Sequence, residues 1–357
     1  MHTLITLSMQ SMAASYRCVS AECHRRLSEL RRANHTATSR PYRAALILHG
    51  LSASRSQVGY QTVFDDESFA TLRANWIESN PEYAFDVYLH SWSSDAEAEV
   101  VRVAGAKRHL FEPAKAAHEF PDSLAALDVE ALQASKPLTR RPGPDKRPVS
   151  PAQALHGLYS RFHSLSRAVA LVGAELDSYD AVLLSRFDLV VRTPLRLPSL
   201  ELRGNAIYAP QFSLQPQLSA RAIHCNDPKP GACGAVLDGV WLPLETFDPS
   251  LFRQGVMDYF FVATPEAARR MATLIDALPS YLSVGSPYMT DWKWPVRLTG
   301  HGLCAYHFVQ AELQPRLLPL QEGDDFALVR QARCVVATEG PRKGQCLLGQ
   351  QQSVEPT

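Results

Sequence analysis

A short polar segment interrupts one of the most apolar stretches of the chain. Ser185, Arg186 and Asp188 lie between apolar residues within the range 180–191. Ionised side chains inside an apolar strand are costly unless they pair, bind a metal ion or emerge at a sheet edge. Asp188 could ligate a divalent ion that in turn holds a diphosphate, and Arg186 could neutralise phosphate charge. A structural Arg186–Asp188 ion pair would explain the same residues, so the segment alone leaves both interpretations open.

Alternating strands and helices must position this segment. A continuous apolar run at 44–50 that ends in glycine predicts a strand buried on both faces, and 83–90 predicts a second strand. Between them, acids followed by apolar residues at helical spacing predict a helix over 65–79. This order indicates a parallel α/β unit, and such sheets bind ligands beyond the carboxyl ends of their strands.

The strongest predicted helix comes directly before the interrupted strand. Ser150 can cap it and Pro151 suits its first turn. Apolar residues then recur at steps of three and four, at Leu155, Leu158, Phe162, Leu165, Val169, Val172 and Leu176. This stripe predicts a helix that faces the core. Further strands are predicted at 206–210 and 256–263, and Thr264 begins another helix with a proline and an acid in its first turn.

Composition and charge exclude several classes of protein. The 357 residues are 46% apolar and 20% charged, which suits a packed core and argues against wholesale disorder. The chain has 36 basic residues (lysine and arginine) and 36 acidic residues (aspartate and glutamate), so its net charge is zero. Because no overall positive charge would attract nucleic acid, we expect no nucleic acid partner. No stretch is apolar enough to span a membrane and the N-terminus lacks the basic start of a signal peptide, so we expect a cytoplasmic protein.

The cysteines do not indicate a disulfide scaffold. Cys225 and Cys233 flank one loop, and Cys334 and Cys346 flank another, so each pair could bridge or remain as free thiols. Zinc at His224, Cys225 and Cys233 would have only three ligands and no Cys-x-x-Cys pair, which is a weak signal.

Three segments together resemble a group of nucleotide-sugar glycosyltransferases of the GT-A type. Residues 179–189 match a pattern of Tyr-Asp, an apolar strand and Arg-x-Asp-Leu, in which Arg-x-Asp stands in place of the family's Asp-x-Asp motif. Residues 86–92 look like the family's second strand, and 258–266 are similar to its later strand and helix start. The matches follow the family's order and lie within residues 44–310.

The resemblance implies an α/β fold with a GT-A-like, Rossmann-type mixed sheet that is mostly parallel and flanked by helices. It implies a single catalytic domain, which we expect at 42–311. The charged segment 1–41 is expected to be an N-terminal extension, and the weakly patterned segment 312–357, with its polar tail, a C-terminal extension. Within the domain, the segment 134–151 is rich in proline and charge and is expected to be an exposed insertion.

The resemblance also implies an activity and roles for individual residues. A sugar would move from a nucleotide-sugar donor to a glycan or other hydroxyl acceptor, as in polysaccharide biosynthesis, with Mn²⁺ or Mg²⁺ on the diphosphate. Asp188 and His301 would bind the metal, and Asp258 would act as the catalytic base at the acceptor. The donor-binding residues would be His49, Gly50, Arg55, Arg186 and Asp188.

Alternatives stay open for these residues and for the whole chain. His301 and Asp258 could be structural, and Arg55 lies further from Gly50 than the family pattern has it. A non-catalytic carbohydrate-binding or scaffold protein could keep the same fold. An α/β-hydrolase is disfavoured because no Gly-x-Ser-x-Gly elbow is present. A P-loop and a Gly-x-Gly-x-x-Gly loop are also absent.

Overall fold

A computed structural model of the chain describes residues 41–56, 59–62, 64, 66–113, 122, 126–128, 150–210, 234–237, 240–243, 256–291, 299–318, 320 and 326–328. The N-terminal extension up to residue 40, nearly all of the insertion predicted at 134–151, the two cysteine pairs and His224 lie outside these residues.

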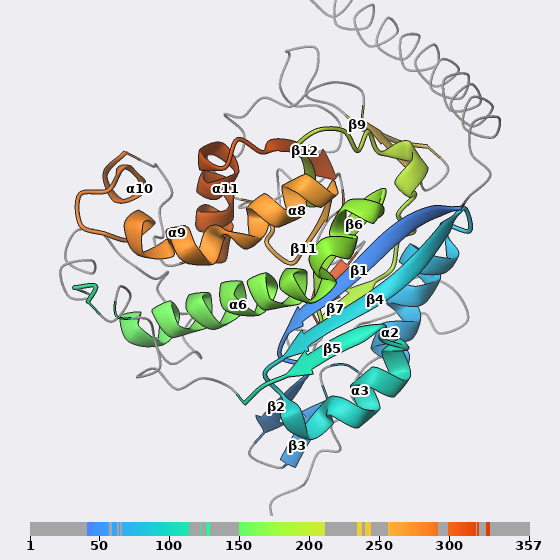
Figure 1. Ribbon diagram of the computed structural model, residues 1–357, viewed down its shortest axis with the longest axis horizontal. Helices are drawn as coiled ribbons and strands as arrows, with labels where there is room; N and C mark the ends of the chain where they lie inside the picture. The colour runs from blue at the N-terminus through green and yellow to red at the C-terminus, as the bar shows by residue number, and fades with distance from the viewer. Residues whose placement is uncertain are drawn as a thin grey trace, which may run out of the picture.

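A seven-stranded sheet organises the described residues (Figure 1). Its strands, in spatial order, are β12 (Gln314–Leu318), β8 (Ala206–Pro210), β11 (Phe260–Ala263), β6 (Ala181–Arg186), β1 (Tyr42–Gly50), β4 (Tyr83–Ser91) and β5 (Arg108–Phe111). Only β11 is antiparallel to its neighbours, β6 and β8, and every other pair in this sheet is parallel.

Helices cover both faces of the sheet, as Figure 1 shows. One face is covered by α6 (Pro151–Val172), α8 (Pro265–Ala272), α9 (Leu274–Tyr281), α10 (Pro287–Thr290) and α11 (Gly300–Gln310). The other is covered by α2 (Asp66–Leu72), a π-helical segment (Arg73–Glu78) and α3 (Glu97–Ala104). The expected fold class, an α/β fold with a mostly parallel sheet flanked by helices, is confirmed.

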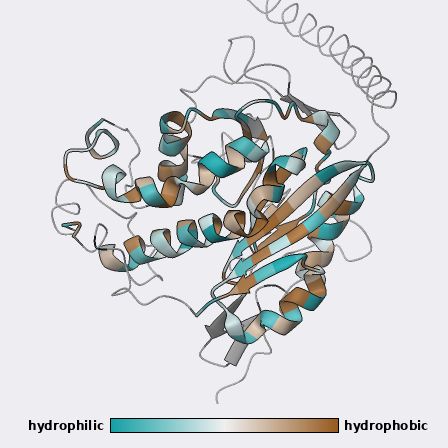
Figure 2. Ribbon diagram, in the orientation of Figure 1, coloured by the Kyte–Doolittle hydropathy of each residue, from teal (hydrophilic) through white to brown (hydrophobic). Residues whose placement is uncertain are grey.

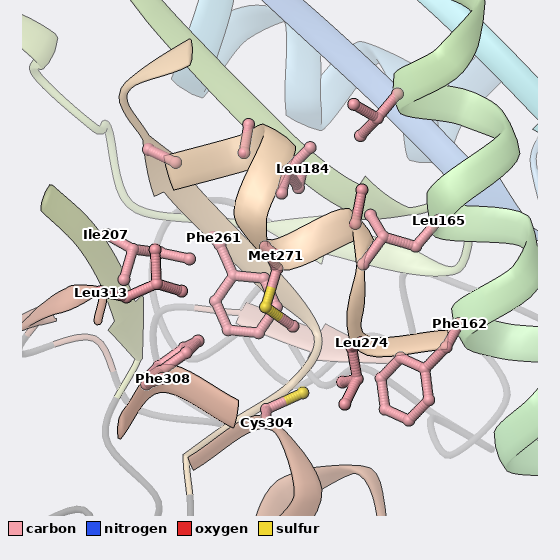
Figure 3. Close-up of a cluster of buried hydrophobic side chains, with 14 of the residues drawn as sticks. Phe162, Leu165, Leu184, Ile207, Phe261, Met271, Leu274, Cys304, Phe308 and Leu313 are labelled. Atoms are coloured by element: carbon pink, nitrogen blue, oxygen red, sulfur yellow. The ribbon is translucent and has the colours of Figure 1, made fainter. Parts of the chain in front are cut away.

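Two hydrophobic cores lie on the two faces of the sheet. In β1, Ala45 and Ile47 belong to one core and Leu46 and Leu48 belong to the other. The central strands are accordingly apolar along their length (Figure 2). Figure 3 shows the α6 side of the sheet, where side chains from α6, β6, β11 and α11 pack together. A strand buried on both faces needs the continuous apolar run found in the sequence.

Helix starts follow the sequence closely. Ser150 caps α6 by accepting a hydrogen bond from the backbone N–H of Gln153, whose side chain in turn bonds the Ser150 backbone. Thr264 caps α8 in the same way, accepting from the Ala267 backbone N–H at 3.1 Å. Both helices carry proline in the first turn, where its missing N–H has no partner to lose.

Two predicted strands are shorter than expected, and both differences lie next to charged residues. The predicted strand at 180–191 is divided, because β6 ends at Arg186 and β7 (Leu189–Val191) pairs instead with β13 (Phe326–Leu328). The predicted strand at 256–263 begins only at Phe260 as β11. Backbone hydrogen bonds from residues 256 and 257 go to α11 and to the end of β8, so these residues leave the sheet ladder.

Small two-stranded units complete the described residues. A hairpin of β2 (Ala53–Ser56) and β3 (Gly59–Thr62) follows β1, and β9 (Gly234–Leu237) pairs with β10 (Val240–Pro243). The sheet also continues past residue 311, because β12 lies in the segment that the sequence assigned to a C-terminal extension. The domain boundaries themselves stay a prediction. Among the described residues, none of the helices has the length and apolarity needed to cross a membrane.

Candidate functional site

The strand order brings three separate segments to one edge of the sheet. The carboxyl ends of β1 and β6 are adjacent, with His49 opposite Arg186. Because β11 runs antiparallel, its amino end lies at the same edge, and the Arg186 backbone N–H donates to the Tyr259 carbonyl at 3.2 Å. Asp258, just before β11, therefore joins the residues that end the parallel strands. Ligands of α/β sheets bind at this edge.

Arg186 and Asp188 form a bidentate ion pair in the turn after β6. Arg186 Nε donates to Asp188 Oδ1 at 2.7 Å and Nη2 donates to Oδ2 at 2.6 Å. The guanidinium also lies 5.4 Å from the centroid of the Tyr259 ring. Burial alone would lower the pKa of Arg186, but the Asp188 carboxylate outweighs burial and raises it. The ion pair that the sequence left as one interpretation is thus present.

Asp258 is a buried carboxylate held between two basic side chains. Arg161 of α6 pairs with its Oδ2 through Nη1 and donates to its backbone carbonyl through Nη2. His301 Nδ1 lies 3.0 Å from Oδ1. Burial alone would raise the pKa of Asp258, but Arg161 and His301 overcome that effect and hold it well below its usual range. Asp258 is therefore ionised throughout the neutral range.

Gly300 lets the first turn of α11 approach this carboxylate. A Cβ at position 300 would lie 1.8 Å from Asp258 Oδ2 and 3.1 Å from Arg161 Nη1, so no larger residue fits without a shift. Thr299 caps the helix, and its start places the positive end of the helix dipole beside Asp258. The next residue, His301, is directed toward Asp258 and also lies 2.9 Å from the Val256 carbonyl.

His49 is buried at the same edge with one ring nitrogen unpartnered. Its Nδ1 has no hydrogen-bond partner within the described part of the chain. Burial lowers the pKa of His49 well below its ordinary value, and the nearby charges of Arg161 and Arg186 lower it further. His49 is therefore neutral at pH 7 and retains one donor and one acceptor nitrogen.

A second network ties the end of β1 to α6. Ser164 Oγ accepts from the Gly50 backbone N–H at 2.7 Å and lies 2.7 Å from His90 Nδ1. On the far side of the ring, His90 Nε2 lies 2.8 Å from Glu112 Oε2. The order serine, histidine, carboxylate resembles a nucleophilic triad, but Ser164 is fully buried and its oxygen is engaged by the backbone. The network holds the turn at Gly50, where φ is +109°.

These donors do not fit the divalent ion that the sequence led us to expect. Both oxygens of Asp188 accept hydrogen bonds from Arg186, and Asp258 is enclosed by Arg161 and His301. Nowhere in the described residues do three or more histidine, cysteine, aspartate or glutamate side chains gather as a metal site would need. The expected Mn²⁺ or Mg²⁺ on Asp188 and His301 stays a prediction, and no chemical step is derived from it.

The structure places most of the expected site residues close together. The residues that share this edge are His49, Gly50, Arg186, Asp188, Asp258 and His301. Arg55 lies on the β2–β3 hairpin, and its side chain is outside the described residues. The roles assigned to all of these residues stay predictions, because position alone does not assign a role.

Sequence reasoning missed Arg161, Ser164, His90 and Glu112. A signal for Arg161 was present, because it lies three residues after Leu158 and four before Leu165 on the apolar side of the long helix. A charged residue at such a position needs a buried partner. Glu112 offered no comparable signal, because its role depends on β5 lying beside β4.

No family model matches this chain, and no curated protein matches it in sequence. Among solved structures, the apo form of mouse xyloside xylosyltransferase 1 is similar, with 12% identity and a TM-score of 0.35 over 78% of this chain and 84% of that one. The apo structure of the WbbM bifunctional glycosyltransferase is similar, with 12% identity and a TM-score of 0.29 over 80% of this chain and 40% of that one. Both TM-scores are low, so the function proposed below rests on the site's own residues.

Proposed function

We propose that this protein is a glycosyltransferase that moves a sugar from a nucleotide-sugar donor to a hydroxyl group of a glycan or other acceptor. One observation carries the proposal: the Arg186-x-Asp188 element meets Arg161, Asp258 and His301 at the carboxyl edge of the parallel strands. Charged groups are concentrated at the edge where α/β sheets bind ligands, and the resemblance of the segment 179–189 to GT-A enzymes supports the same reaction class.

The turn after β1 suits one side of the donor site. Gly50, the last residue of β1, has a positive φ, so the chain turns where the strand ends. Ser164 fixes that turn from α6, and Ser52 Oγ lies 2.7 Å from Ser91 Oγ at the end of β4. Two strand ends are thus joined into a rigid rim on which a nucleotide could rest.

Transfer requires a group that stabilises the leaving diphosphate. The bond between the anomeric carbon and the diphosphate oxygen breaks, and its electron pair stays on that oxygen. A new bond forms between the anomeric carbon and the acceptor oxygen, whose proton passes to a base. Preorganised positive charge beside the leaving oxygen lowers this barrier, because negative charge grows there in the transition state. Arg161 and Arg186 supply positive charge at this edge.

The base for the acceptor proton is still the predicted Asp258. In the conformation described, its carboxylate pairs with Arg161 and lies 3.0 Å from His301 Nδ1, so proton transfer to it requires one of them to withdraw. We therefore expect Asp258→Asn to lower kcat by more than about tenfold if Asp258 is the base, since general bases contribute about 10²–10⁴-fold. An unchanged kcat would restrict Asp258 to holding Arg161 and His301 in place.

A thermal-shift panel tests the proposed function. We expect one of UDP, GDP or CDP, or a sugar derivative of it, to raise the Tm of the full chain, because a ligand that binds only the folded state stabilises it. A nucleotide at a hundred times its Kd adds about 2.7 kcal/mol. The nucleotide-sugar that binds is then incubated with the protein, and release of its nucleoside diphosphate is measured with and without glycan acceptors.

Two outcomes would contradict the proposal. Failure of every nucleotide and nucleotide-sugar to shift the Tm would remove the donor site. A shift by simple glycans alone would instead favour the non-catalytic carbohydrate-binding alternative. As a matched control, Arg43→Lys at the opposite end of the sheet should leave the nucleotide shift unchanged, whereas Arg186→Lys should reduce it.

A further inference from the structure

The charges at the candidate site are arranged with the carboxylates inside and the guanidinium groups outside. The side chains of Asp188 and Asp258 are each 1% exposed, whereas those of Arg186 and Arg161 are 17% and 19% exposed. A site for a divalent cation would present its carboxylate oxygens to the incoming ion. This site presents positive charge to solvent and covers its carboxylates.

Both arginines keep donors that have no hydrogen-bond partner among the described residues. Arg186 binds Asp188 through Nε and Nη2, and Arg161 binds Asp258 through its two Nη atoms. Among the described contacts, Arg186 Nη1 and Arg161 Nε have no partner. The unpartnered Nδ1 of the buried His49 lies in the same cluster, close enough for both guanidinium charges to lower its pKa. Within the described part of the chain, three polar groups from three different elements therefore have unused hydrogen-bonding capacity at one place.

We propose that Arg161 and Arg186 bind the diphosphate of the donor directly and that this binding needs no divalent cation. The inference rests on the proposed function and specifies how its donor is held. The buried aspartates fix the two guanidinium planes before the ligand arrives, so little side-chain entropy is lost on binding. Guanidinium groups match phosphate oxygens in geometry and form charge-assisted hydrogen bonds with them.

The same arrangement disfavours a metal-bound diphosphate. A divalent ion would have to displace Arg186 from both oxygens of Asp188 or enter between Asp258, Arg161 and His301. Either route brings a double positive charge against guanidinium groups already in place and leaves a displaced arginine without its partner. An anion meets the opposite situation, since the exposed part of the cluster already carries the complementary charge.

Calorimetric titration of the full chain tests the inference without any mutation. Inorganic pyrophosphate, UDP, GDP and CDP are titrated in EDTA and, separately, in Mn²⁺. We expect pyrophosphate and one nucleoside diphosphate to bind in EDTA with a Kd no more than about threefold weaker than in Mn²⁺. Because Mn²⁺ neutralises part of the ligand's charge, equal or weaker binding in the metal is also expected.

Charge-conserving variants test the assigned residues. Arg161→Lys and Arg186→Lys keep a cation beside each buried aspartate but lose the planar fork, so each should weaken binding in EDTA about tenfold or more. Arg203→Lys is the matched control, because Arg203 is 77% exposed and, among the described residues, forms an ion pair only with Glu201 at 3.6 Å. Circular dichroism and Tm identify a variant that fails to fold. If a variant fails to fold, the titrations of the wild type in EDTA and in Mn²⁺ still test whether binding needs a metal ion.

The outcomes separate this inference from the proposed function. Binding that appears only in Mn²⁺ and disappears in Asp188→Asn would overturn the inference while leaving a nucleotide-dependent transferase intact. Binding in EDTA that neither lysine variant weakens would overturn the assignment to Arg161 and Arg186. Absence of nucleoside diphosphate binding under both conditions would overturn the proposed function and the inference together.

Discussion

The two ends of the same parallel strands carry charged networks of opposite construction. At the amino end, Asp86 of β4 accepts from Arg43 at 2.7 Å, from the Tyr179 hydroxyl at 2.6 Å and from Lys107 at 3.0 Å. The Arg43 and Asp86 side chains are both 29% exposed. At the carboxyl end, Asp188 and Asp258 are almost fully buried beneath arginines that keep donors without a partner among the described residues. The first network is partly hydrated, and its carboxylate is surrounded by donors. In the second, the carboxylates are buried and the arginines above them are partly exposed.

This difference in burial distinguishes charged residues that stabilise the sheet from charged residues that are positioned to bind a ligand. An exposed ion pair is worth little, and its loss is tolerated because water replaces the partner. A buried pair is expensive to form, and removing one partner strands the other charge away from water. The segment 179–189 contains both kinds, since Tyr179 and Asp180 bind Arg43 at the amino end whereas Arg186 and Asp188 end the strand at the site.

The largest difference should appear when a buried pair is broken. Arg161→Ala leaves Asp258 ionised and buried, so we expect the free energy of unfolding to fall by about 3–5 kcal/mol, measured by urea denaturation. Arg167→Ala on the same helix removes only an exposed pair with Glu112, and a loss of about 1 kcal/mol or less is expected. Equal losses in the two variants would show that the buried Arg161–Asp258 pair contributes no more to the free energy of unfolding than an exposed pair does.

A smaller but still substantial effect is expected at Gly300. In Gly300→Ala the new Cβ meets the Asp258 carboxylate, and relief of that clash should cost about 1–3 kcal/mol of stability and weaken nucleotide binding. Gly157 is the matched control, because it lies inside α6 with open space around the Cβ position. Gly157→Ala should stabilise the chain by about 0.5–1 kcal/mol. A Gly300→Ala variant as stable as the wild type would mean that Asp258 moves freely.

The amino-end network should respond weakly and without effect on the site. Asp86→Asn keeps the shape of the side chain but removes its charge, and we expect a loss of about 1 kcal/mol because the group is partly hydrated. The nucleotide-dependent rise in Tm should match that of the wild type. Loss of that rise would mean that the two ends of the sheet are coupled and would remove the distinction drawn between them.

A pH dependence that originates at the carboxyl end is the last expected effect. The folded chain holds the pKa of His49 well below the ordinary value of about 6.5, so below that pH the unfolded chain binds more protons. The contribution of neutral, buried His49 to the free energy of unfolding is fully present above about pH 6.5 and is lost as pH falls toward the folded pKa. This loss is no more than about 1.4 kcal/mol per pH unit. His49→Gln should flatten the slope of unfolding free energy between pH 7 and 5.

The control for this slope is His109→Gln, since His109 is an exposed residue on β5. His90, whose pKa is also lowered by burial despite Glu112, should preserve part of the slope in both variants. An unchanged slope in His49→Gln would show that His49 is solvated in solution.

The sequence predicted the layers of the fold but missed several residues that contact the candidate site. Continuous apolar runs gave β1, β4 and β6, and the stripe from Leu155 to Leu176 gave α6, because each pattern follows from local burial. Arg186 and Asp188 were found because two charges interrupt an apolar run. The position of Arg161 on the apolar side of the long helix indicated a buried partner, but its partner Asp258 is distant in sequence and reaches it through the reversed direction of β11. A local pattern can show that a charged residue needs a partner, but it does not show which partner the strand order supplies.

A single helix, α6, contacts both sides of the site. Arg161 and Ser164 are one turn apart on α6, about 4.5 Å along its axis, and they contact the segment before β11 and the turn after β1 respectively. The Trp92 indole is fastened to the same turn, donating to the Ser160 carbonyl at 2.9 Å. Rotating α6 about its axis would disturb all three attachments together. The spacing between the two sides of the site is therefore set by the rise of three residues along one helix.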